Sequence, residues 1–368
     1  MPAGGTPAGD TLMGNTPASG APAGGAPVWR GSISFEEQYG LFKNEIDVFL
    51  DRKLPAYEAE GQKLLGEAMR YSVSAGGKRI RGVLAMAVFE LLDGLSGQSR
   101  TRLDRLPART DRKQASDILR SKSPDPAPEP MEIYPRTAIL TLAGAVEFIH
   151  AYSLIHDDMP CMDDDDYRRG KPSCHKAYGE GIAMLAGDAL LNLAMELLLD
   201  QAAYISAESR RAPASGIISG LRFTEAAAYM ARAAGAGGMA GGQAIDLVAD
   251  IHDGERLKYM HRLKTGRLFD AAILAPAVCL RADADAYEAL SRYGGALGCA
   301  FQIKDDLIDY QNEKSDAESR NYVSMFGVSR AEYAFCEACS DALNSLGGFS
   351  GEADFLRGMV KYISDMNA

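Results

Sequence analysis

The chain has 368 residues, of which 46% are hydrophobic and 24% charged, so it can bury a sizeable core. Its 39 Lys and Arg residues stand against 50 Asp and Glu residues, which gives a net charge of −11. This acidic balance argues against general nucleic-acid binding, which needs a basic face to replace phosphate counterions. From the apolar runs we expect no segment of the ~18 residues that a membrane-spanning helix needs.

Residues 1–31 are rich in Ala, Gly, Pro and Thr, which predicts a disordered tail. The tail lacks the basic and apolar regions of a secretory signal, and residues 1–29 contain no Arg or Lys, unlike a transit peptide. The six cysteines are scattered, and the one C-x-x-C (Cys336, Cys339) has no second ligand pair. We therefore expect reduced thiols packed as small apolar residues, and a cytoplasmic location.

Apolar residues recur every three or four positions from Phe35 onward, which predicts helices at about 35–49, 57–74 and 79–92. Residues 96–132 are polar, basic and Pro-rich, which predicts a long surface insertion. Further helices are expected at 136–159, 181–203, 224–249, 255–280, 285–313, 329–346 and 351–366. Because no alternating strand pattern or hairpin dipeptide is visible, the predicted fold is all-α, a single helical domain over 32–368.

The sharpest chemical feature is an acidic run at 157–166, with six carboxylates in ten residues at the end of an apolar helix. Most acidic runs are solvated, but this one continues a helix expected to be buried, where like charges are costly without a cation. Asp157 and Asp163 would not share a face of an ideal helix, yet Pro160 distorts the chain and can return Asp163 to Asp157. Carboxylates without His or Cys at ligand spacing favour magnesium over zinc.

A second acidic cluster lies far downstream. Asp305 and Asp309 are four residues apart, hence about 40° apart on one helix face. Magnesium in proteins usually binds one or two carboxylates together with substrate phosphates. The two clusters therefore predict a di- or triphosphate ester held by Mg²⁺ between two Asp-rich helices.

Basic residues accompany these clusters. The segment GGKRIR at 76–81 places cations after a glycine turn at a helix start, a natural anion site. Arg168 and Arg169 directly follow the acidic run, and Lys264 lies in a predicted helix. Each alone is more often a surface charge, but together they indicate a cavity for two phosphorylated ligands.

With these motifs the sequence resembles the trans-type isoprenyl diphosphate synthases, and among them the bacterial farnesyl and geranylgeranyl diphosphate synthases. The resemblance covers roughly 33–95 and 134–329 and rests on GGKRIR, IHAYSLIHDDMPCMDDDDYRRGKPSCHKAYGE, LAGDAL, GGQAIDL, HRLKTGRL and FQIKDDLIDY. It implies an all-α bundle around a central cavity, usually homodimeric. It also implies Mg²⁺-dependent condensation of isopentenyl diphosphate with an allylic diphosphate, either dimethylallyl or geranyl.

The resemblance also assigns roles by position. The implied magnesium ligands are Asp157, Asp163 and Asp305, with Asp309 lining the second site. The groups implied around the allylic diphosphate and the reacting carbons are Arg168, Lys264, Thr265 and Gln302. The positions implied for isopentenyl diphosphate are Lys78, Arg81, His150 and Arg169. In the family reaction the allylic diphosphate ionises, the isopentenyl double bond attacks the cation, and a proton is lost.

Product length is the finest implication. In this family it depends on bulk just upstream of the first motif, where this chain has Tyr152 and then Ser153. An aromatic residue about one and a half turns before Asp157 would close the bottom of the cavity and favour a fifteen-carbon product. An ordinary core tyrosine is an equally good interpretation of Tyr152.

Three departures from the family pattern keep alternatives open. One is that the tail at 1–31 and the insertion at 96–132 have no counterpart in compact members of the family. The segment 311–324 is shorter than its family counterpart and lacks a Lys before Asn321-Tyr322, and the printed sequence ends without a basic residue. A farnesyl diphosphate synthase is the first hypothesis, and a geranyl or geranylgeranyl diphosphate synthase is the second. The short segment favours a weakly active regulatory subunit, which both acidic clusters oppose. A terpene cyclase would not need the GGKRIR anion site.

Overall fold

The computed structural model describes residues 33–96, 135–211, 218–248, 253–312 and 321–366. Apart from Ser96, the predicted tail and the predicted insertion lie outside these residues, as does 313–320 in the shortened segment. The described residues are mostly helical and contain almost no strand, which confirms the all-α prediction.

The first three helices build one side of the bundle: α1 (Phe35–Lys53), α2 (Glu60–Ser74) and α3 (Ile80–Ser96). Helix α1 begins with a capping box, in which Ser34 and Glu37 each bind the other's backbone N–H. Of the apolar residues whose spacing predicted this helix, Phe35, Tyr39, Phe42 and Ile46 are buried, whereas Phe49 is only partly buried. Helix α1 packs on α3 and α5.

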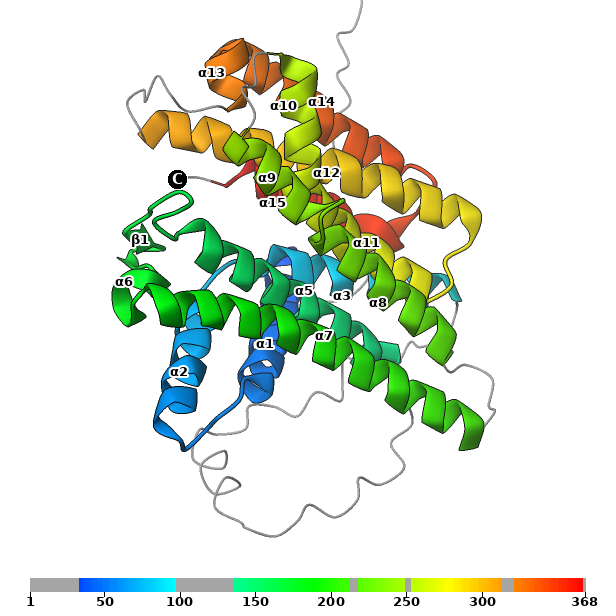
Figure 1. The fold of residues 1–368 in the computed structure, drawn as a ribbon. Coiled ribbons are helices and arrows are strands. Elements are labelled where there is room, and N and C mark those ends of the chain that lie inside the picture. The colour runs from blue at the N-terminus through cyan, green and yellow to red at the C-terminus, as the bar shows by residue number, and fades with distance from the viewer. Residues whose placement is uncertain (1–32, 97–134, 212–217, 249–252, 313–320, 367–368) are drawn as a thin grey trace, which may run out of the picture.

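Two long helices, α5 (Pro135–Asp157) and α7 (Glu180–Arg211), pack along each other. Helix α5 is buried over most of its length and also contacts α3 and α11. Helix α11 (Arg267–Cys279) lies between this pair and the pair α12 (Ala284–Asn312) and α14 (Val328–Ser345) (Figure 1). The carboxyl end of α5 and the last turns of α12 carry the two acidic clusters.

Shorter elements complete the chain. They are α6 (Cys174–Tyr178), α8 (Gly220–Ala234), α9 (Met239–Val248), α10 (Gly254–His261), η2 (Arg262–Gly266), α13 (Tyr322–Phe326), η3 (Gly351–Ala353) and α15 (Asp354–Ser364). The single helix expected at 224–249 is wrong, because the chain leaves helical geometry at Gly235 and divides into α8 and α9. The helix expected at 255–280 contains a π-helical turn, η2.

The expectation of no strands needs a small correction. Strands β1 (Tyr167–Arg168) and β2 (Lys171–Pro172) pair antiparallel directly after the acidic run. Both turn residues, Arg169 and Gly170, have positive φ, as a two-residue hairpin turn requires. The usual signal has Asn or Asp at the first turn position, so an arginine there concealed the hairpin.

The expectation about apolar segments also needs correction. Two helical segments, Pro135–Asp157 and Glu180–Glu208, are long and apolar enough by composition to cross a membrane, although no unbroken apolar run reveals them. The apolar window of the first is 72% buried, which marks a core helix, whereas that of the second is 39% buried. Helix α7 therefore presents apolar side chains outward, among them Met184, Leu185 and Leu199.

The six cysteines are all free thiols. Only Cys174 and Cys279 are buried, so packing as small apolar residues is right for these two and wrong for the exposed Cys161, Cys299 and Cys336.

Candidate active site

The first acidic cluster is shaped by the turn that ends α5. After Asp157 the backbone closes a compact turn in which the Asp163 N–H donates to the Asp157 carbonyl at 2.9 Å. Two further bonds, from Met162 and Asp164 to the Met159 carbonyl, fix the same turn. The predicted return of Asp163 to Asp157 is therefore confirmed at the backbone.

Lys264 lies close enough to the carboxylates of Asp157 and Asp163 to change their pKa values. Burial raises the pKa of Asp157 to about 6, and Lys264 only partly offsets that effect. Burial lowers the pKa of Lys264, but the carboxylates of Asp246, Asp157 and Asp163 reverse this, so its net shift is upward. Lys264 is thus protonated at neutral pH. Its ammonium group lies beside the first acidic cluster, where it can interact with an anionic ligand.

The position of Lys264 depends on α9, a helix in which no site residue was predicted from the sequence. The Lys264 ammonium donates to Asp246 at 2.6 Å, and both side chains are about one-quarter exposed. Four residues before Asp246 lies Gly242, where a Cβ would come within 2.2 Å of the Lys264 backbone nitrogen. Only glycine lets α9 approach η2 this closely, and that approach brings Asp246 to Lys264.

The residue after Lys264 connects the first cluster to the second. The Thr265 hydroxyl donates a short hydrogen bond to Gln302 on α12. Gln302 in turn donates to Asp306 at 2.9 Å. Since a π-turn re-aims successive side chains relative to an α-helix, η2 can offer Lys264 to one cluster and Thr265 to α12.

The second cluster contains two kinds of aspartate. Burial and the neighbouring Asp309 raise the pKa of Asp305 to about 7, against the opposite effects of Arg81 and Lys78. Asp306 is instead buried and structural, because it accepts Gln302 and the backbone N–H of Tyr322 at 2.7 Å. Asp306 thereby anchors the start of α13 within the shortened segment, a role that its sequence context did not indicate.

The GGKRIR turn packs against the arginine pair. The Arg169 guanidinium donates a short hydrogen bond to the Gly76 carbonyl, and a Cβ at Gly77 would lie 2.8 Å from the same guanidinium. The predicted anion site and the arginines after the acidic run are therefore brought together. Lys78 is exposed beside them, and its carbonyl accepts the Tyr39 hydroxyl in a short hydrogen bond.

Arg81 is a buried cation with spare hydrogen-bonding capacity. The residue is 8% exposed, and its guanidinium carbon lies 4.8 Å from the Phe269 ring centroid and 6.0 Å from that of Phe301. Its Nε has no hydrogen-bond partner. A buried, unsatisfied guanidinium donor is costly, and a diphosphate oxygen is the type of acceptor that would satisfy it.

A pocket lies between α2, α5 and the β1–β2 hairpin, lined by polar and charged groups that include Glu147, His150, Arg168 and Arg169. Burial and four nearby guanidinium groups hold the pKa of His150 well below its usual value, so this imidazole is neutral at pH 7. Arg168 is oriented by Asp158 and by Asp165, the latter at 2.9 Å. Asp158 is buried and serves Arg168, which its place in the acidic run did not indicate.

The two residues expected to control product length lie on α5. Tyr152 is partly buried and meets His156 edge to face, with ring centroids 5.7 Å apart. Its pKa is raised by burial and by Asp157, which places its hydroxyl in the field of the first cluster. Ser153 donates its hydroxyl to the His150 carbonyl at 3.0 Å.

The residues present fit the magnesium that the resemblance implies. Asp157 and Asp305 offer carboxylate oxygens, and the pKa of each is raised because burial outweighs the neighbouring cations. A bound divalent cation would favour the ionised form of both carboxylates and so lower their raised pKa values. Asp163, next to Asp157 and exposed, supplies a further oxygen donor.

Comparisons with known proteins identify the family of this chain. The chain is 33% identical over 312 residues to a dimethylallyltranstransferase of Fischerella ambigua, covering 81% of this chain and 75% of that protein. It is 31% identical to the farnesyl diphosphate synthase of Bacillus subtilis (79% and 85% covered) and 32% identical to the large subunit 1 of a heterodimeric geranylgeranyl pyrophosphate synthase of Arabidopsis thaliana (78% and 67% covered).

Among solved structures, an FPP/GFPP synthase from Zymomonas mobilis superposes with a TM-score of 0.68 at 33% identity, covering 89% of this chain and 98% of that one. A geranyltransferase from Legionella pneumophila gives 0.69 at 26% identity, covering 90% and 96%. The family model described as polyprenyl synthetase matches residues 62–320. The chain therefore belongs to the polyprenyl synthetase family.

Proposed function

We propose that this chain is a magnesium-dependent short-chain prenyltransferase that condenses isopentenyl diphosphate with dimethylallyl and geranyl diphosphate to give farnesyl diphosphate. The observation that carries the proposal is that Lys264 and Thr265 connect the first acidic cluster to the helix of the second. Lys264 faces the partly buried carboxylate of Asp157, and Thr265 binds Gln302, three residues before Asp305. In a site connected in this way, Lys264 and the aspartates of the two clusters would bind one diphosphate. Arg81 and the cations near it would bind a second diphosphate.

The proposed reaction begins with departure of the allylic diphosphate. Asp157, Asp163 and Asp305 would hold magnesium, which supplies Lewis-acid stabilisation of the leaving group's negative charge. Lys264, kept protonated by Asp246, and Arg168, oriented by Asp158, provide fixed positive charge toward the same group. Such preorganised charge lowers the barrier because it needs no rearrangement as the bond breaks.

The second substrate would bind on the opposite side. Arg81, with its unsatisfied Nε, together with Lys78 and Arg169, suits a diphosphate that stays intact. The neutral His150 adds a donor without adding repulsion among the guanidinium groups. The Thr265 hydroxyl and Gln302 amide oxygens are dipoles that can stabilise an allylic cation without reacting with it.

The fifteen-carbon product is the finer part of the proposal. Tyr152 occupies the helix that ends in Asp157, and its ring is braced by His156. A tail growing along α5 from a diphosphate at Asp157 would meet this ring. The relatives include both farnesyl and geranylgeranyl synthases, so a twenty-carbon product is the second candidate.

Substitution at Tyr152 tests the length control. We expect Tyr152→Ala to shift the main product from fifteen to twenty carbons or more, measured by mass spectrometry of the dephosphorylated products. Tyr333→Ala, at a 70% exposed tyrosine on α14, is the control and keeps the wild-type product. An unchanged product from Tyr152→Ala would refute the control of length by this ring.

We also propose that the chain works as a homodimer through the outward face of α7. Leu185 and Leu199, 53% and 67% exposed, lie fourteen positions apart and hence on one helix face. We expect the wild type to have the mass of a dimer in light scattering and Leu185→Glu to have that of a monomer. Leu221→Glu on α8, at a residue 71% exposed, should stay dimeric. The cytoplasmic location remains a prediction.

A further inference from the structure

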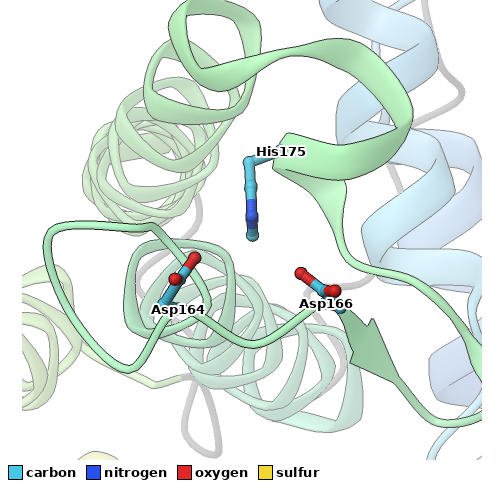
Figure 2. A group of neighbouring side chains, drawn as sticks. All are labelled: Asp164, Asp166 and His175. Atoms are coloured by element: carbon cyan, nitrogen blue, oxygen red, sulfur yellow. The ribbon is translucent and has the colours of Figure 1, made fainter.

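A second group of possible metal ligands lies beside the first acidic cluster. Asp164, Asp166 and His175 each offer one ligand atom, and these atoms lie within 4.8 Å of one another. Figure 2 shows the imidazole of His175 pointing into the gap between the two carboxylates. None of the three belongs to the set Asp157, Asp163 and Asp305 assigned above to magnesium.

The histidine gives the independent reason to expect a ligand. His175 is only 5% exposed, and its Nε2 is buried without a hydrogen-bond partner. Its Nδ1 lies 3.0 Å from the Ser173 hydroxyl, which is itself buried. In the tautomer that carries its proton on Nδ1, Nε2 has a free lone pair, and it belongs to a ring that points between the two carboxylates. A cation between them is what would make this arrangement favourable.

The two carboxylates are held where such an ion would need them. The Asp164 backbone N–H donates to the Met159 carbonyl at 3.1 Å, and the Asp166 carbonyl accepts the Ser173 N–H at 2.9 Å. Lys176 binds one oxygen of Asp166, Oδ1, at 2.6 Å, which leaves Oδ2 for another partner. Asp164 and Asp166 are exposed, so an ion could enter from solvent and keep a water ligand.

We propose that Asp164, Asp166 and His175 bind one divalent ion of the zinc type, separate from the catalytic magnesium. One imidazole and two carboxylates with an open position form a donor set that suits zinc, whereas magnesium prefers oxygen ligands alone. The Nδ1 contact to Ser173 is the outer hydrogen bond that usually orients a metal-binding histidine. The ion would join the end of the acidic turn to the start of α6 and restrain the β1–β2 hairpin between them.

Ion counting tests this proposal independently of any prenyltransferase activity. The untagged full-length protein is stripped with chelator and titrated with Zn²⁺ against a chromophoric competitor, with millimolar Mg²⁺ present to occupy the oxygen-only site. We expect each of the variants Asp164→Asn and His175→Gln to bind one Zn²⁺ ion per chain fewer than the wild type. Asp165→Asn removes the adjacent charge outside the group and should bind as the wild type does.

The Asp164→Asn variant keeps the test interpretable if His175→Gln fails to fold. Asp164 is exposed and has a φ of 54°, a conformation that asparagine adopts readily. Equal zinc stoichiometry in the wild type and in Asp164→Asn would overturn the proposal. Crystals soaked in Zn²⁺ give the second readout: an anomalous peak among the three side chains supports it, and zinc found only at Asp157 and Asp305 contradicts it.

Discussion

Gly242→Ala should impair catalysis more than folding. The added Cβ would lie 2.2 Å from the Lys264 nitrogen and 2.6 Å from its Cα, whereas ordinary contact begins at 3.4 Å. Relief therefore requires α9 and η2 to separate by about 1.2 Å, because 3.4 − 2.2 = 1.2. Both atoms belong to the backbone, so no side chain can rotate away. The displacement acts directly on the 2.6 Å contact between Asp246 and Lys264.

The expected magnitudes separate the two effects. Overpacking typically costs about 1–3 kcal/mol, and replacing a helical glycine by alanine returns about 1 kcal/mol, so the net loss of unfolding free energy should be at most about 2 kcal/mol. A misplacement of about 1 Å in a catalytic array can lower the rate about 100-fold. We therefore expect a folded protein with turnover reduced about 100-fold.

The assay for Gly242→Ala is the rate of product formation at saturating substrates, with urea unfolding in parallel. Gly295→Ala on α12 is the matched control, because a Cβ there meets nothing within 4 Å. It should keep wild-type turnover and gain up to about 1 kcal/mol of stability. Turnover of Gly242→Ala within threefold of the wild type would refute the argument that the contact between α9 and η2 positions Lys264.

Three further predictions concern aspartates. Asp157→Ala should lower turnover by about 1,000-fold or more while circular dichroism stays unchanged, and near-normal rates would remove its metal-ligand role. Asp246→Asn should lower turnover about tenfold by releasing Lys264, with a smaller effect in the double variant with Lys264→Met than additivity predicts. Burial raises the pKa of Asp270 to about 6 from 3.8, so this group's contribution to stability is complete below pH 4 and is lost as the pH rises through 6. That loss of unfolding free energy is about 3 kcal/mol. Urea unfolding should therefore show the stability of Asp270→Asn, relative to the wild type, rising by a similar amount between pH 4 and 7. A difference that stays constant over this range would contradict the prediction.

The sequence could predict the helices and the acidic turn because both follow from local rules. Apolar residues at steps of three and four placed α1 correctly, and the constraint that Pro160 imposes on Met159 anticipated the bond between Asp163 and the Asp157 carbonyl. The glycine pair before Lys78 likewise marked the turn that Arg169 contacts.

The remaining features depend on contacts between segments distant in sequence. Nothing local to Asp246 shows that its carboxylate reaches Lys264, because that depends on Gly242 admitting the backbone of η2. Asp158 and Asp306 look like their acidic neighbours, yet burial and partners give them structural roles. The π-turn is concealed for the same reason, since its residues are compatible with an ordinary helix.

The most direct test of the account is the product formed from defined substrates. The purified protein is incubated with isopentenyl diphosphate, Mg²⁺ and either dimethylallyl or geranyl diphosphate, and the dephosphorylated products are identified by mass spectrometry. We predict a fifteen-carbon alcohol from both allylic substrates and none when Mg²⁺ is removed by chelation. A folded protein that forms no condensation product from either substrate would contradict the proposed function, and would favour a regulatory subunit instead.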